Sequence, residues 1–458
     1  MLILTCLLAF YLAWNLGAND VANSMGTSVG SKAVTLRQAL IIAGVLEFTG
    51  AVLFGQNVSE TLVTQIVNPE FFGQTPQIFL TGMLAVLVAS GLWINLATAF
   101  GLPVSSSHAV VGAIAGFGWA AVGFEAVDWP SIRTITLTWI LTPLLSGAIA
   151  ALFYTIIKRF ILDQPHPLQQ LQEWIPWLST ALFSIFGVIV LPSFSQPIQR
   201  FLSQYLGILL PSHTILLGMG AIASVGLTFV LWGQLGQAIG DQGSGIGNRE
   251  ANGEPPWVIR HGSLAEDKEQ RTKDEKIQNP ESKIQNLSPS PELLLARFQL
   301  LSACFVAFAH GSNDVGNAIA PLAAIVATLQ TGTVPIDSIQ IPLWVLVLGG
   351  TGIVVGLAVW GKRVITTVGE NIIALQPSGG MCAELATATT ALLASQAGLP
   401  VSTSHALVGG VVGVGLAQAW KTVELQTVRT IGLTWIATIP AAIGLGALTF
   451  RLFSYWLP

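Results

Sequence analysis

Long apolar segments alternate with short polar ones along most of the chain, and this pattern predicts a bundle of membrane-spanning helices. Three stretches contain no Asp, Glu, Lys or Arg: Phe71–Phe124, Phe201–Gly240 and Leu385–Trp420. A helix needs about 20 apolar residues to cross the hydrocarbon core, so each stretch is long enough for one or two crossings. Strands of a membrane barrel would alternate apolar and polar residues instead. We therefore expect an all-α integral membrane protein with about 10 to 12 passes, some shorter pieces being re-entrant.

One segment has a different character. Residues 241–292 are rich in Gly, Pro, Ser, Asn and Gln and carry dense mixed charge, as in EDKEQRTKDEK at 266–276. Such a segment cannot bury enough apolar surface to fold, so we expect a disordered hydrophilic loop. It separates an N-terminal membrane repeat, residues 1–240, from a C-terminal membrane repeat, residues 293–458.

The two membrane halves repeat each other in sequence. Three segments of the first half return in the same order after nearly the same interval: Asn19–Ser24 as Asn313–Ala318, Leu102–Gly118 as Leu399–Gly415, and Arg133–Ile140 as Arg429–Ile436. Internal repeats of this kind are typical of secondary transporters, whose sites lie at the repeat interface near the bilayer midplane.

Basic residues indicate that the second repeat is inverted. Lys32 and Arg37 lie in the first loop of the first half, whereas Lys362 and Arg363 lie one loop later in the second half. Cytoplasmic loops are enriched in Lys and Arg, so this swap predicts opposite orientations for the two halves. The first loop would then be cytoplasmic and the N-terminus external.

Composition agrees with a membrane protein and excludes several classes. Hydrophobic residues make up 52% of the 458 residues and charged ones 9%, against about 25% charged in soluble proteins. The net charge of −4 comes with no basic patch, so nucleic acid is not an expected partner. The three cysteines have no metal-binding or disulfide spacing. No GxSxG, HExxH, phosphate-binding loop or cofactor motif occurs, so we expect neither an enzyme nor a bound cofactor.

The polar motif Gly17–Gly26, GANDVANSMG, interrupts the first apolar run. On a helix Asp20 and Asn23 share a face, with Asn19 and Ser24 beside it. These amide and carboxylate groups suit an alkali cation or a protonated oxyanion better than a transition metal. Hydrogen bonding between helices is the alternative explanation. A second copy at Gly311–Ala320, again with an ionisable Asp, favours a functional site.

The second paired motif, LPVSSSH and LPVSTSH, predicts two helix starts inside the membrane. Pro103 and Pro400 interrupt apolar runs and precede hydroxyl clusters. The clusters are Ser105, Ser106 and Ser107 in the first half, and Ser402, Thr403 and Ser404 in the second. Free N–H groups and the positive end of a helix dipole bind anions, although the same geometry also serves ordinary capping.

Four further ionisable residues stand in apolar surroundings. His108 and His405 follow the hydroxyl clusters, and we expect them to bond to backbone carbonyls. Glu47 and Glu384 are buried acids that could carry a coupling proton or bind a cation. Neither has an acidic equivalent in the other half.

These paired motifs resemble those of the inorganic phosphate transporter (PiT) family of secondary carriers. GANDVANSMG and HGSNDVGNAIAP are similar to its paired signatures, LPVSSSHAVVG and LPVSTSHALVG to its proline–hydroxyl–histidine segments, and Glu47 and Glu384 to its glutamates. The resemblance implies two inverted repeats with re-entrant hairpins, a phosphate site between them, and a cytoplasmic central loop. It also implies cotransport of phosphate with sodium or protons, and a plasma-membrane location, the inner membrane in a bacterium.

We hypothesise two overlapping sets of site residues. The phosphate set is Asp20, Asn23, Ser105, Ser106, Ser107, Asp314, Asn317, Ser402, Thr403 and Ser404. The cation-coupling set is Asn19, Asp20, Asn313, Asp314, Glu47 and Glu384, with a sodium ion at Asn19, Asp20, Asn313 and Asp314. Sulfate or another oxyanion as substrate, a passive anion channel or receptor, and a membrane-embedded phosphate-ester hydrolase are the alternatives. Lipid is an expected partner, and a homodimer is one oligomeric state left open.

Overall fold

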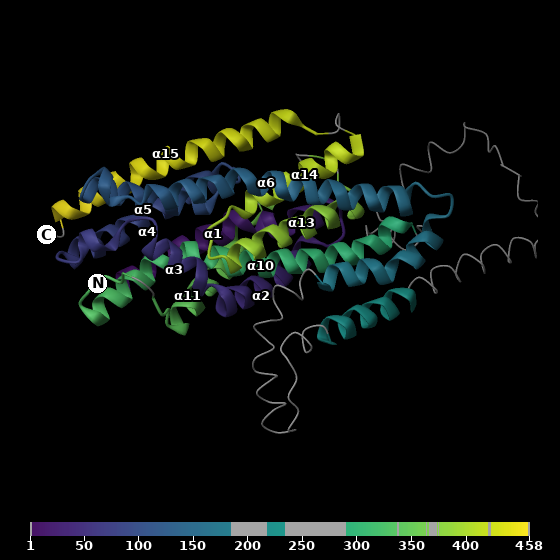
Figure 1. The fold of residues 1–458 in the computed structure, drawn as a ribbon, viewed down its shortest axis with the longest axis horizontal. Coiled ribbons are helices and arrows are strands. Elements are labelled where there is room, and N and C mark those ends of the chain that lie inside the picture. Colours follow the sequence, from purple (N-terminus) through teal and green to yellow (C-terminus); the bar gives the residue numbers. More distant parts are fainter. Residues whose placement is uncertain are drawn as a thin grey trace, which may run out of the picture.

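The structure is a computed structural model that describes residues 2–184, 218–233, 290–336, 339–362, 364–365, 373, 375–419 and 423–456. This described part is almost entirely helical, as the predicted all-α class requires (Figure 1). Seven of its helices are long and apolar enough to cross a membrane. Apart from residues 290–292, the predicted central loop lies outside the described residues, as do residues 185–217 and Arg363.

The first half contains these elements: α1 (Leu2–Gly30), α2 (Leu36–Phe54), α3 (Gln56–Thr64), the 3-10 turn η1 (Pro69–Phe72), α4 (Pro76–Ala99), α5 (Ser106–Ala121), the 3-10 turn η2 (Phe124–Ala126), α6 (Trp129–Ile157) and the π turn η3 (Lys158–Leu162). Residues 167–184 and 218–233 are also helical. The second half contains α10 (Pro291–Thr331), α11 (Leu343–Trp360), α13 (Pro377–Gln396), α14 (Thr403–Ala419) and α15 (Leu425–Trp456).

The sequence repeat corresponds to a structural one. Helices α1, α2, α4, α5 and α6 occupy the same places in the first half as α10, α11, α13, α14 and α15 in the second. In Figure 1, α6 and α15 run in opposite directions along the bundle. Opposite directions of equivalent helices are consistent with the predicted inverted repeat.

The two halves interleave instead of forming separate bodies. Helix α1 packs on α11 and α10 on α2, while α5 packs on α15 and α14 on α6. Each of these contacts joins one repeat to the other. In lipid, helices associate through close packing and polar contacts, because apolar burial gives little driving force there.

Glycines make the contacts between α5 and α15 close. A methyl group added at Gly446 of α15 would overlap the carbonyl oxygen of Ala113, and one at Gly116 of α5 would overlap the carbonyl of Ile443. Gly413 of α14 and Gly147 of α6 meet in the same way in the equivalent contact. Small residues at these points let the helix backbones touch.

Two helical hairpins have short irregular loops whose last residues, 103–105 and 400–402, are buried. Helices α4 and α5 are joined by residues 100–105, and α13 and α14 by residues 397–402. Gly101 (φ 66°) and Gly398 (φ 68°) hold equivalent left-handed positions at the ends of α4 and α13, where glycine is favoured. As the proline–hydroxyl pattern predicts, α5 begins at Ser106 and α14 at Thr403.

We predict that Gly446→Ala destabilises the protein and that Gly444→Ala, two residues away on the same helix, does not. The first methyl group would overlap the backbone of Ala113, whereas the second would meet no atom within 4 Å. Alanine is also favoured over glycine in helices by about 1 kcal/mol. The thermal unfolding midpoint in detergent should fall for Gly446→Ala and stay level or rise for Gly444→Ala. Equal midpoints would contradict the close contact of α5 with α15.

Candidate functional site

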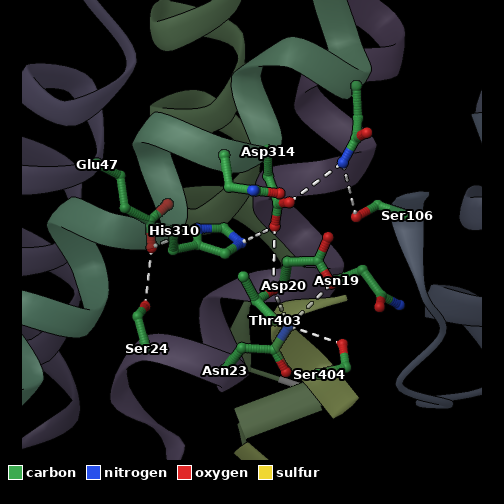
Figure 2. Close-up of polar contacts among 12 residues, drawn as sticks. Asn19, Asp20, Asn23, Ser24, Glu47, Ser106, His310, Asp314, Thr403 and Ser404 are labelled. Atoms are coloured by element: carbon green, nitrogen blue, oxygen red, sulfur yellow. Dashed lines mark hydrogen bonds and ion pairs between the residues drawn. The ribbon is translucent and has the colours of Figure 1, made fainter. Parts of the chain in front are cut away.

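The two copies of the asparagine–aspartate motif meet in the centre of the bundle (Figure 2). Asp20 on α1 is 1% exposed and Asp314 on α10 is 0% exposed. Asn23 donates from Nδ2 to Asp20 Oδ1 over 3.1 Å, and Asn317 donates to Asp314 Oδ1 over the same distance. Each aspartate thus has its own asparagine one helical turn later, as the i, i+3 spacing predicts.

Each motif also bonds to the hydroxyl cluster of the other repeat. Asn23 Nδ2 lies 2.8 Å from Ser404 Oγ and 3.4 Å from Thr403 Oγ1. Asn317 Nδ2 lies 3.0 Å from Ser107 Oγ and 3.5 Å from Ser106 Oγ. The polar site is therefore built from α1 and α10 together with the beginnings of α5 and α14.

The hydroxyl clusters divide into two roles. Thr403 donates from Oγ1 to Asp314 Oδ2 over 3.1 Å. Ser107 Oγ and Ser404 Oγ reach across to the carbonyls of Val401 and Val104, at 2.8 and 3.2 Å. The remaining members of the predicted set, Ser105 and Ser402, cap α5 and α14 by accepting the N–H groups of His108 and His405 at 3.2 Å. The clusters thus cap the helices and also serve the site.

Asn19 and Asn313 hold the hairpins. Asn19 donates to Thr98 Oγ1 at 2.9 Å and to the carbonyl of Leu102 at 3.0 Å, and accepts the N–H of Val104 at 3.1 Å. The amide of Asn313 lies 2.9 Å from the Oγ atom of Ser395, the residue equivalent to Thr98. The structure thus brings together the two aspartates of the predicted sodium site and places these two asparagines against the hairpins.

Next to the aspartates lies His310, which the sequence reasoning missed. Its Nε2 atom lies 2.8 Å from Asp314 Oδ2 and its Nδ1 atom 3.3 Å from Glu47 Oε1. Ser24 donates to the same Glu47 oxygen over 2.8 Å. The predicted coupling residue Glu47 is therefore joined to the site through an imidazole. The spacing could have revealed this residue, because His310 precedes Asp314 by four positions and shares its face of the helix.

The site combines three buried carboxyl groups with one imidazole. Asp20, Asp314, Glu47 and His310 are each at most 1% exposed. Ligand atoms of Asp20, His310 and Asp314 lie within 4.8 Å of one another, a group able to hold a metal ion. Asp20 Oδ2 is buried without a hydrogen-bond partner among the described residues. Several negative charges out of water are unstable unless protons or cations neutralise them, so this site is suited to binding one or the other.

Glu384 lies in a second buried cluster. Its carboxyl group accepts hydrogen bonds from four side chains on α1 and α10: Thr27, Ser28 and Ser302 at 2.6 Å, and Gln299 at 3.3 Å. Thr27 follows Asp20 by seven residues, about two helical turns or 10 Å. Glu384 is therefore near the two aspartates along α1 but takes its hydrogen bonds from other residues.

His108 and His405 contact backbone carbonyls. His108 Nδ1 lies 3.4 Å from the carbonyl oxygen of Trp435, and His405 Nδ1 lies 2.9 Å from that of Trp139. Neither imidazole contacts the aspartates through the bonds that the described residues make. Their contacts fit a structural role between the hairpins and the long helices α6 and α15.

Comparisons with known proteins give one consistent result. The profile of the phosphate transporter family matches residues 16–446. Among curated relatives, inorganic phosphate transporter 2-1 of Arabidopsis thaliana chloroplasts is 38% identical over 454 residues, covering 98% of this chain and 72% of the relative. A putative phosphate permease of Pyrococcus abyssi is 34% identical, covering 98% and 97%. A solved structure described as the sodium-dependent phosphate transporter has a TM-score of 0.78 at 33% identity, covering 100% and 99% of the chains.

We predict that Ser107→Ala destabilises the protein, because it removes the donor to Val401 and the acceptor of Asn317 together. Buried polar groups left without partners cost about 1–3 kcal/mol. The matched control is Ser454→Ala, since the exposed Ser454 bonds only to the carbonyl of its own helix at Arg451. Thermal unfolding in detergent should show a lower midpoint for Ser107→Ala alone, and equal midpoints would argue against the bonds between the repeats.

Proposed function

The chain belongs to the phosphate transporter family, and we propose that it is a secondary active transporter that takes up inorganic phosphate together with a cation by alternating access. One observation carries this proposal. Two buried aspartates from equivalent helices, Asp20 and Asp314, share a site with the hydroxyl-bearing starts of two further helices, α5 and α14. Groups that suit a cation and groups that suit an oxyanion thus lie side by side.

Phosphate would be bound by neutral donors. The starts of α5 and α14 offer backbone N–H groups and the positive ends of two helix dipoles. Ser106, Ser107, Thr403 and Ser404 add hydroxyls, and Asn23 and Asn317 add amide N–H groups. No Lys or Arg side chain bonds to these residues in the described part of the chain. Binding without a fixed positive charge leaves the anion free to be released.

The aspartates make anion binding depend on a cation. A carboxylate beside an anion repels it, unless a cation or a proton lies between them. Asp20 and Asp314 would bind that cation, with His310 and Glu47 adjusting the charge on the Asp314 side. Carboxyl groups can accept hydrogen bonds from a phosphate that retains protons but repel fully ionised sulfate, which favours phosphate as the substrate.

The closed site and the paired repeats support alternating access. The two aspartates are 1% and 0% exposed, so solvent on neither side reaches them in this conformation. Transport then requires opening first to one side and later to the other. Movement of one repeat against the other around a fixed site is the usual means in proteins built this way. We also propose that the membrane is the plasma membrane.

We predict that the purified protein in liposomes accumulates radiolabelled phosphate above its equilibrium level when a cation gradient is imposed. Three conditions separate the possibilities: an inward sodium gradient, an inward proton gradient, and no gradient. Accumulation in either gradient identifies the coupling cation, and unlabelled sulfate should compete poorly. Equilibration without accumulation in every condition would indicate a channel, and strong competition by sulfate would indicate a different substrate.

We also predict that Asp20→Asn and Asp314→Asn each abolish coupled uptake, because the amide cannot hold the cation while its size and hydrogen bonds are largely kept. Asp128→Asn is the control, since Asp128 caps the start of α6 by accepting the N–H of Ser131 and asparagine caps equally well. Uptake into liposomes should be lost in the first two variants and retained in the third. Cation-dependent uptake retained in both Asp20→Asn and Asp314→Asn would refute these roles.

A further inference from the structure

The loop before α14 bonds to a tryptophan of the other repeat, and the equivalent tryptophan of the second half makes no such bond among the described residues. Trp139 on α6 donates from its indole Nε1 to the carbonyl of Pro400, in the loop before α14, over 2.9 Å. Trp435 is the equivalent residue on α15, and Pro103 is the equivalent of Pro400. The Nε1 atom of Trp435 is buried and has no hydrogen-bond partner among the described residues. One of two equivalent bonds is therefore formed and the other is not.

The histidines that follow the loops show the same difference. His405 Nδ1 lies 2.9 Å from the carbonyl of Trp139, whereas His108 Nδ1 lies 3.4 Å from that of Trp435. The His108 ring packs on Trp139 at 3.9 Å between centroids, the His405 ring on Trp435 at 3.7 Å, and the two histidines lie 4.7 Å apart. Four rings thus pack in a continuous row from Trp139 through His108 and His405 to Trp435.

The asparagines anchor the two loops through different atoms. Asn19 bonds to the carbonyl of Leu102 and the N–H of Val104. Asn313, with its amide oriented so that both its oxygen and its nitrogen have partners, donates to the carbonyl of Val401 over 3.2 Å. The first loop is thus held from α1, and the second is held from α10 and also by Trp139 from α6. The two repeats have the same fold but different conformations at equivalent points.

An exchange of conformations between the two repeats would explain why the equivalent contacts differ. Because the halves are equivalent in fold, a state in which each half adopts the hairpin contacts of the other can form with the two membrane sides exchanged. We infer that Trp139 and Trp435 are alternating latches. The Trp139 indole holds Pro400 in the present closed state, and the Trp435 indole holds Pro103 in the counterpart state, from which the site opens to the opposite side of the membrane. This inference rests on the alternating access of the proposed function.

Each latch would determine where the hydroxyl groups that follow its loop lie. Pro400 precedes the cluster Ser402, Thr403 and Ser404 by two residues, so the Trp139 bond fixes where those hydroxyls lie. Release of the loop would move them relative to Asp314, to which Thr403 donates. A buried indole N–H without an acceptor is unfavourable. Forming one latch while the other opens keeps the number of satisfied indoles constant and the two states close in energy.

The test compares Trp139→Phe with Trp435→Phe, which remove one indole N–H each and retain an aromatic ring. The background is cysteine-free, with Cys6, Cys304 and Cys382 changed to Ala. A reporter cysteine is placed at Ser31, near the end of α1, or at Ile325, its equivalent on α10. In an inverted repeat these positions lie toward opposite sides of the membrane. The rate of labelling by a membrane-impermeant maleimide in detergent reports which side is open.

We predict reciprocal effects. Trp139→Phe should change the labelling rates at the two reporters in opposite directions. We expect a change of about threefold or more, because the loss of one hydrogen bond shifts an equilibrium by about this factor. Trp435→Phe should change them in the reverse sense, and the double variant should return the ratio of rates to that of the parent. A purely structural role would instead give shifts of the same sign in both single variants.

The outcomes separate this inference from the proposed function. Same-sign shifts, or no shift, in variants that still accumulate phosphate in liposomes would overturn the latches and leave transport standing. Failure of the unmutated protein to accumulate phosphate under any gradient would refute the transport mechanism itself. Reciprocal labelling together with coupled uptake supports both.

Discussion

Burial of ionisable groups away from water constrains the rest of this structure. A carboxylate in a low-dielectric interior is stable only with donors, counter-charges or protons around it. Asp20 and Asp314 obtain one donor from their own helix, and the asparagines that supply it are themselves bonded to the hydroxyl cluster of the opposite repeat. Neither repeat can complete its polar site alone. Interleaving of the halves is therefore a requirement of the chemistry as well as a packing arrangement.

Symmetry of the backbone coexists with asymmetry of charge. Gly17 on α1 packs against the backbone of Ile353, and Gly311 on α10 packs in the same way against Glu47. Because each glycine contacts backbone atoms, the helix positions do not depend on which side chain stands at the contacted residue. The two halves can therefore carry different side chains at equivalent positions. Glu47 in the first half is equivalent to Ile353 in the second, and His310 in the second half is equivalent to Leu16 in the first. The two halves share the helix framework but not these ionisable groups.

The sequence was sufficient for features that depend on local pattern. Apolar runs predict the helices, the repeated motifs predict the equivalent elements, and Pro103 and Pro400 with their hydroxyl clusters predict the starts of α5 and α14. It was insufficient for features that depend on packing between distant segments. Nothing local says that Asn23 bonds to Ser404, or that Thr27 and Ser302 from two helices converge on Glu384. The sequence pattern does not reveal the role of His310, because its partner Glu47 is 263 residues away.

The asymmetric groups would give the proposed transport path two unlike ends. Ser24 and Thr27, which contact Glu47 and Glu384, follow Asp20 toward the end of α1. Ser302, which also bonds to Glu384, precedes Asp314 toward the start of α10. In antiparallel helices these are the same side of the aspartates. The equivalent of Glu384 on the other side is Leu87. A proton or cation leaving toward the end of α1 therefore meets carboxyl groups and hydroxyls, while one leaving the other way meets hydrocarbon at the equivalent positions. Under the proposed alternating access, the opening would reverse while these carboxyl groups stay on the side toward the end of α1, so the two routes of ion release would remain unlike.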